Sequence, residues 1–198
     1  MRVFHLLIIF GFCFYGCNKS KEMKEKLYPD RPYETAKIDN FYWGTAGHDN
    51  LKIPLIKPFF LYSDSHNLEW SLDLKEIKSK PKYIVLDSLK RDYLNFTSFQ
   101  NIRQFNVENY YIYGVQYEYE IFESKVPRLF FVINTQEKKL TFFDKENDFI
   151  TELKKLNLSE ELLSPDAVFE QYKNDPVLSW FPEDIKKQLE EVKKEKGN

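Results

Sequence analysis

The spacing of apolar residues changes once along this chain, and that change constrains the fold class. Residues 52–143 contain short runs rich in β-branched and aromatic residues, several with the period-two alternation of strands. From residue 144 onward, apolar residues recur every three or four positions, as on one face of a helix. Strands first and helices last predict an α+β fold: an antiparallel sheet of about six to seven strands, with C-terminal helices packed on one face.

Turn-forming residues and prolines divide the strand region. Pro54 and Pro58 confine the run 52–63 to an edge or irregular strand, because proline has no amide hydrogen to donate. A hairpin is expected to turn at Glu108-Asn109, and the nearly all-apolar run 128–134 is typical of a central strand. The other expected strands cover residues 68–74, 82–88, 101–107, 110–122 and 139–143, with a turn at 136–138.

Three helices are expected in the C-terminal part. Asp144 can cap the first, and the last begins near Pro182. The pair Ser164-Pro165 is a strong start signal for the middle helix, because serine caps helices well and proline suits the first helical position. The first and last helices carry the apolar stripes Phe149/Leu153/Leu156 and Ile185/Leu189/Val192.

The first sixteen residues have the character of a signal peptide. Arg2 supplies positive charge, and the apolar run 3–15 is shorter than the roughly 20 residues that span a bilayer. Gly16, a small residue, precedes Cys17 at the point where the sequence becomes charged. An ordinary secretory signal and an uncleaved anchor are the plain alternatives for such a segment.

The sequence Phe14-Tyr15-Gly16-Cys17 resembles the lipobox of bacterial lipoproteins. Gly16 and Cys17 match that motif, Phe14 replaces the usual leucine, and Tyr15 is bulkier than the usual residue. The resemblance implies cleavage before Cys17, a diacylglyceryl thioether on its sulfur and acylation of the new amino group. The implied partner is therefore the lipid bilayer, because two or more acyl chains anchor a protein firmly.

These features divide the chain into three parts. Residues 1–16 are the expected signal peptide, 17–38 a polar, flexible tether, and 39–198 a single globular α+β domain. In well-studied lipoproteins an aspartate after the lipidated cysteine favours the inner membrane, whereas this chain has Asn18. The expected location is the bacterial cell envelope, at the outer membrane and facing the periplasm.

Several chemistries are excluded or disfavoured by composition. With Cys17 modified and Cys13 removed, the mature chain has no free thiol for a disulfide or a nucleophile. It carries 28 basic against 31 acidic side chains, a near-neutral balance that does not suggest a nucleic-acid partner. His48 and His66 lie in no metal-ligand pattern, so no metal, no cofactor and no catalytic residue is expected.

The tyrosine-rich run 110–122 is the most distinctive stretch of the sequence. Burial of a large aromatic side chain is worth about 1.5–3 kcal/mol, so its uncharged tyrosine face is expected to pack inward under the C-terminal helices. The open face then carries Gln116, Glu118 and Glu120, which are the candidate partner-binding residues. Two glutamates at i and i+2 point the same way and fit a glycosidase pair badly. The inward face comprises Tyr111, Tyr113, Val115, Tyr117, Tyr119 and Ile121.

The expected function is that of a membrane-tethered, non-enzymatic protein-binding domain. The chain resembles, in size, signal and aromatic strands, small envelope lipoproteins, some of which are immunity proteins that neutralise envelope-targeting toxins. The alternatives are an envelope hydrolase acting on glycan and a structural lipoprotein of envelope assembly. An enzyme should show a cleft with converging polar groups, whereas a binding domain should show an exposed aromatic or acidic patch.

Overall fold

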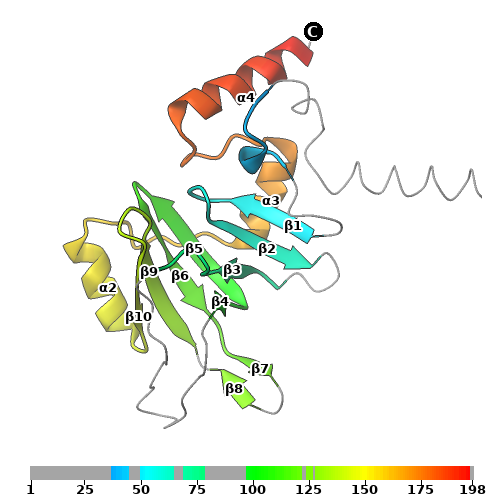
Figure 1. Ribbon diagram of the computed structural model, residues 1–198. Helices are drawn as coiled ribbons and strands as arrows, with labels where there is room; N and C mark the ends of the chain where they lie inside the picture. Colours follow the sequence, from blue (N-terminus) through cyan, green and yellow to red (C-terminus); the bar gives the residue numbers. More distant parts are fainter. Residues whose placement is uncertain are drawn as a thin grey trace, which may run out of the picture.

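The computed structural model describes residues 37–44, 50–64, 69–78, 97–121, 124–126 and 128–196. Cys17, most of the expected tether and the expected strand at 82–88 lie outside these residues. The described part forms two antiparallel sheets and three α-helices, which confirms the α+β class and the antiparallel pairing (Figure 1).

The strands form two four-stranded sheets and a separate two-stranded ribbon, instead of the single sheet expected. Sheet A has the order β1-β2-β3-β4 and sheet B the order β10-β9-β6-β5, while β7 and β8 form the ribbon. The strands of sheet A are β1 (Asn50–Pro54), β2 (Phe60–Asp64), β3 (Ser71–Asp73) and β4 (Ser98–Phe99). Those of sheet B are β5 (Ile102–Glu108), β6 (Tyr111–Gln116), β9 (Leu129–Asn134) and β10 (Lys139–Phe143). The ribbon consists of β7 (Tyr119–Ile121) and β8 (Ser124–Val126).

The expected strand at 52–63 is in fact a hairpin, β1 and β2, whose link contains Pro58. The link closes on itself, since the Leu55 amide donates to the Phe59 carbonyl at 3.1 Å. The expected hairpin near residue 108 is present and turns at Asn109–Tyr110, one residue later than predicted. The run 128–134 is a central strand as expected, because β9 pairs with both β6 and β10.

The helices begin close to where the sequence places them. Helix α2 is Glu146–Lys155, α3 is Pro165–Asn174 and α4 is Glu183–Lys196. Ser164 is the N-cap of α3 and Pro165 its first residue, as expected. The cap residue of α2 is Lys145, so the expected cap at Asp144 is one residue early. A short 3-10 helix, η2 (Asn40–Tyr42), precedes β1.

The expectation that the helices share one face of a sheet is wrong. Helix α2 covers one face of sheet B through Phe149 and Leu153 (Figure 1). Helices α3 and α4 contribute instead to a second core cluster, which includes residues of both sheets. The cause is that strand β6 is apolar on both faces, with Ile112 on one side and Tyr113 on the other, and both are fully buried. Each face of sheet B therefore needs its own cover.

Residues of both sheets contribute to one hydrophobic core cluster. The rings of Phe99 in β4 and Phe131 in β9 stack with their centroids 4.3 Å apart. Gly114 of β6 allows β5 to approach, because a Cβ there would lie 2.4 Å from the Gln104 carbonyl oxygen. A side chain at position 114 would therefore force sheet B to shift.

The N-terminal segment, residues 37–44, is fastened to this core. Ile38 is buried, the Lys52 ammonium donates to the Phe41 carbonyl at 2.8 Å, and the Tyr172 hydroxyl donates to the Tyr42 carbonyl at 2.9 Å. Asp39 and Lys57 form an ion pair at the surface. These contacts join the segment to both β1 and α3.

Candidate functional site

The three residues predicted to form an open polar face do not lie together. Gln116 is fully buried, which corrects the expectation that it is exposed, and its side-chain oxygen accepts a hydrogen bond from the Gln100 amide at 3.1 Å. Glu118 is exposed and lies after the end of β6, while Glu120 belongs to β7 and pairs in register with Lys125. The expected alternation of buried and exposed side chains fails here because β6 ends at Gln116 and its second face packs on sheet A.

The tyrosine face packs inward in part, as expected. Tyr113 and Val115 are buried against α2, and the Tyr113 hydroxyl donates to the Glu108 carboxylate at 3.3 Å. Burial raises the pKa of Tyr113 well above its ordinary value, so this phenol stays protonated. Tyr111 and Tyr117 are half-buried at the two ends of the strand. The second cover expected here, the Ile185/Leu189/Val192 stripe of α4, instead packs into the other core cluster, which does not include Tyr113 or Val115.

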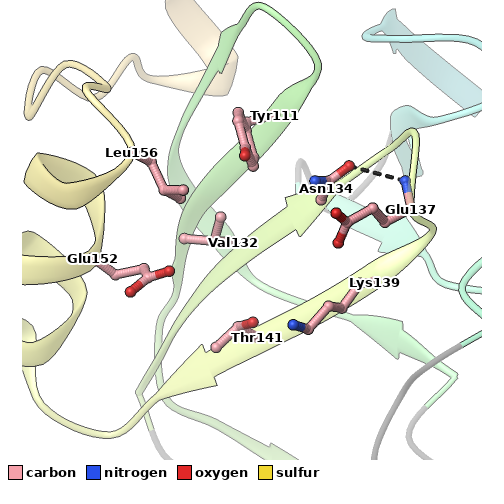
Figure 2. Close-up of a pocket in the computed structure, with 8 residues that line it drawn as sticks. All are labelled: Tyr111, Val132, Asn134, Glu137, Lys139, Thr141, Glu152 and Leu156. Atoms are coloured by element: carbon pink, nitrogen blue, oxygen red, sulfur yellow. Dashed lines mark hydrogen bonds between the residues drawn. The ribbon is translucent and has the colours of Figure 1, made fainter.

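Helix α2 leaves one end of sheet B uncovered, and a groove lies there. Across the sheet, Tyr113, Val132 and Thr141 form one row in register. The next row toward the turns consists of Tyr111, Asn134 and Lys139. Both rows contribute to the floor of the groove, which has a volume of about 180 Å³ (Figure 2).

Two carboxylates form the walls of this groove. Figure 2 shows Glu152 extending from α2 and Glu137 from the β9–β10 turn, on opposite sides of the floor. Glu152 pairs with Lys155 of the same helix at 3.1 Å, and the Lys155 side chain is 71% exposed. None of the ion pairs among the described residues includes Glu137 or Lys139.

Tyr111, which lines the groove, has a second tyrosine ring against it. The ring of Tyr110 lies 4.5 Å from that of Tyr111 with the planes tilted by 36°. Among the described residues, Tyr110 is the one exposed large hydrophobic side chain, at 37%. The pKa of Tyr111 is raised, first by its hydrogen bond with Tyr110, then by burial and by the charges of Tyr110, Glu137 and Glu152.

The two turns that carry these groups are fixed to each other. The amide and the hydroxyl of Thr135 both donate to the Tyr110 carbonyl, at 3.0 and 2.8 Å. The Glu137 amide donates to the Asn134 side-chain oxygen at 2.9 Å (Figure 2). Asn109 and Lys138 adopt left-handed backbone conformations that close the turns. The groove is therefore held in shape without a ligand.

The chemistry available in the groove is hydrogen bonding, charge pairing and aromatic stacking. In the described part of the chain no three His, Cys, Asp or Glu side chains gather to hold a metal ion. A second hollow of about 210 Å³ lies beside Phe60, and its Asp73 and Lys75 neutralise each other at 2.8 Å. The groove beside α2 is the stronger candidate, because two of its charged side chains have no ion-pair partner among the described residues.

Sequence reasoning missed the groove, although part of its signal is visible. Along β9 the helix-facing positions change from Val132 to Asn134, and along β10 from Thr141 to Lys139. This face therefore becomes polar toward the turns. A polar end to an otherwise apolar face indicates where the covering helix stops.

Comparison with known proteins gives no relative: no protein-family model, no curated protein and no solved structure matches the chain. Within the described residues, no helix combines the length and apolar character needed to cross a membrane. The function is therefore inferred from the geometry of the groove and from the N-terminal sequence.

Proposed function

We propose that this protein is a lipid-anchored, non-enzymatic binding domain of the bacterial envelope that holds a protein partner at the groove beside α2. The observation that carries the proposal is the exposed Tyr110, whose ring lies against that of Tyr111, a lining residue of the groove walled by Glu137 and Glu152. Exposed aromatic residues on a rigid turn are typical anchors of protein interfaces, because they contribute contact area at little cost in entropy.

The N-terminal sequence supports the anchor. Cys17 follows Gly16 as in the lipobox, and the polar residues 18–36 connect it to the fastened segment 37–44. A flexible chain of this length would reach roughly 25 Å, so a tether of that kind would allow the domain to meet a partner near the membrane. The proposed site of anchoring is the outer membrane, on the side facing the periplasm.

The anchor is tested with the substitution Cys17→Ala. We expect an unprocessed precursor and loss of labelling by a fatty-acid analogue, because the proposed lipid is attached through the Cys17 sulfur. The matched control is Cys13→Ala, which removes the other cysteine and should leave labelling unchanged. Labelling that persists in Cys17→Ala would contradict the anchor.

Binding at the groove is tested by photocrosslinking in cells. A benzophenone amino acid replaces Tyr110 in the full chain, and the control carries it at Tyr62, a half-buried tyrosine of sheet A. We expect an adduct of one defined mass from position 110 and none of that mass from position 62. Identical adducts from both positions, or no adduct from position 110, would contradict a protein-binding groove.

A further inference from the structure

We propose that the groove beside α2 receives an arginine side chain from the partner protein, held between Glu137 and Glu152 and stacked against Tyr111. This inference rests on the proposed function and names the chemistry of the partner at that site. It is carried by three features of the groove: its charges, its tyrosine wall and its size.

The charges of the groove favour a cation. Two carboxylates and one ammonium group line it, so the lining is net negative. The carboxylates belong to different elements, a turn and a helix, and Figure 2 shows them on opposite sides of the floor. A guanidinium group carries five donors in a planar fork and can reach two carboxylates at once, whereas a lysine ammonium is a compact point charge.

Two cations of the chain itself compete for these carboxylates, and both are weak competitors. Lys155 pairs with Glu152 across one helical turn, with its side chain 71% exposed, and such surface pairs contribute little free energy. Lys139 is exposed and has no ion pair among the described residues. An incoming arginine can therefore displace Lys155 and leave the Lys139 ammonium in water.

The tyrosine wall suits a guanidinium in the same place. Tyr111 lines the groove, and the ring of Tyr110 lies 4.5 Å from its ring. Arginine stacks on aromatic faces more readily than other cations, because its charge is delocalised over a plane. The pKa of Tyr111 is raised mainly by its hydrogen bond with Tyr110 and by burial, and the Glu137 and Glu152 charges raise it further.

The size of the groove limits the occupant to a side chain. A volume of about 180 Å³ holds a planar group and part of its stem, while the body of the partner must remain outside. The exposed Tyr110, whose ring lies against that of Tyr111, would then contact the partner around the inserted arginine. This is the arrangement of an interface anchor surrounded by contacts that exclude water.

The test uses N-acetyl-arginine methylamide as the probe and its neutral citrulline analogue as the control ligand. The full chain is held in detergent micelles, and the amide resonances of Tyr111, Asn134 and Glu137 are followed by NMR during the titration. We expect saturable shifts with the arginine probe and at least fivefold weaker binding of the citrulline analogue. Equal binding of the two probes, or no shifts with either, would overturn the proposal.

Three variants locate the site. Glu137→Gln combined with Glu152→Gln keeps the shape of both walls, and we expect it to weaken arginine binding at least fivefold. Glu191→Gln, on the exposed side of α4, is the matched control and should change nothing. Lys139→Met removes the competing cation and should tighten binding about twofold or more. Weaker binding by Lys139→Met would show that the groove takes an anionic or zwitterionic group instead.

The outcomes separate this inference from the proposed function. A crosslinked partner at position 110 without arginine binding would leave a protein-binding groove and overturn the arginine site. Arginine binding without any crosslinked partner would support the site and contradict the proposed function. Thermal unfolding of each variant, monitored by circular dichroism, confirms that the chain remains folded.

Discussion

Two of the regions where charged groups lie near aromatic rings differ sharply in how exposed those charges are. At the N-terminal segment the Lys52 ammonium lies 4.6 Å from the Phe41 ring centre and 5.2 Å from that of Phe60, and the residue is only 8% exposed. At the groove, Glu137 and Lys139 lie near Tyr111 but are open to water. The Lys52 ammonium has its hydrogen-bond partner within the chain, whereas Glu137 and Lys139 form no ion pair among the described residues.

The difference in exposure distinguishes a charge that holds the structure together from charges that are proposed to bind a partner. Burial lowers the pKa of Lys52 to about 8, which shows that the protein holds this charge at a cost. The cost is offset by the Phe41 carbonyl and two rings, so the contact fixes the N-terminal segment. The groove charges cost little while water solvates them, and a partner would have to replace that water.

The largest expected effect is the contrast between truncating an aromatic ring at the N-terminal segment and truncating one at the groove. Phe41→Ala should lower the free energy of unfolding by about 3–5 kcal/mol, because the ring is buried and packs on Lys52 and Tyr42. Tyr110→Ala should change it by about 0.5 kcal/mol, as exposed substitutions do. Urea denaturation measures both, and similar losses would remove the distinction between the regions.

The next effect is a pH dependence that belongs to Lys52. Its folded-state pKa of about 8 lies below the ordinary value of 10.5, so between these values the unfolded chain binds more protons and stability rises with pH. Below pH 8 both states carry the proton and the contribution becomes flat. We expect a gain of about 2 kcal/mol between pH 7 and pH 9.5 that is absent in Lys52→Met. A variant with the same pH profile as the natural chain would contradict this assignment.

A smaller effect is expected where α3 holds the same segment. Tyr172→Phe removes the buried hydroxyl that donates to the Tyr42 carbonyl at 2.9 Å and should cost about 1–2 kcal/mol. Hydrogen exchange should show faster exchange of the amides of residues 40–44 in this variant. Exchange that increases equally over the whole chain would indicate a global loss of stability instead.

The smallest effect is expected at the groove wall. Glu152→Gln should change the unfolding free energy by no more than about 0.5 kcal/mol, because its pair with Lys155 is exposed to water. The melting temperature should therefore stay close to that of the natural chain. A loss above 1 kcal/mol would show that Glu152 stabilises α2 and is not free to serve a ligand.

Much of the fold follows from local signals in the sequence. Ser164-Pro165 predicts the start of α3 from local sequence, because the fixed backbone of proline suits the first helical position. The apolar run in β9 reads as a central strand, since only a strand buried on both faces is apolar throughout. These features depend on neighbouring residues alone.

What could not be predicted depends on distant parts of the chain. The alternating pattern places Gln116 on an open face, but sheet A covers that face. No residue near Gln116 in the sequence indicates that a second sheet exists. The groove depends on where α2 ends relative to the turn that carries Glu137, which is a matter of how two elements pack. The sequence pattern indicates which residues are apolar. How many sheets bury these residues depends on contacts between distant parts of the chain.

The fastening of residues 37–44 has a mechanical consequence. A tension applied through the N-terminal tether reaches the folded domain at Phe41 and Tyr42, whose carbonyls are held by Lys52 of β1 and Tyr172 of α3. The load is therefore divided between a strand and a helix that are far apart in sequence. Freeing this segment would require both bonds to break, so a domain pulled from its N-terminal side should unfold in one step and not strand by strand. Force spectroscopy with handles at both ends of the chain would show this as a single rupture, and Tyr172→Phe would introduce an earlier, weaker one.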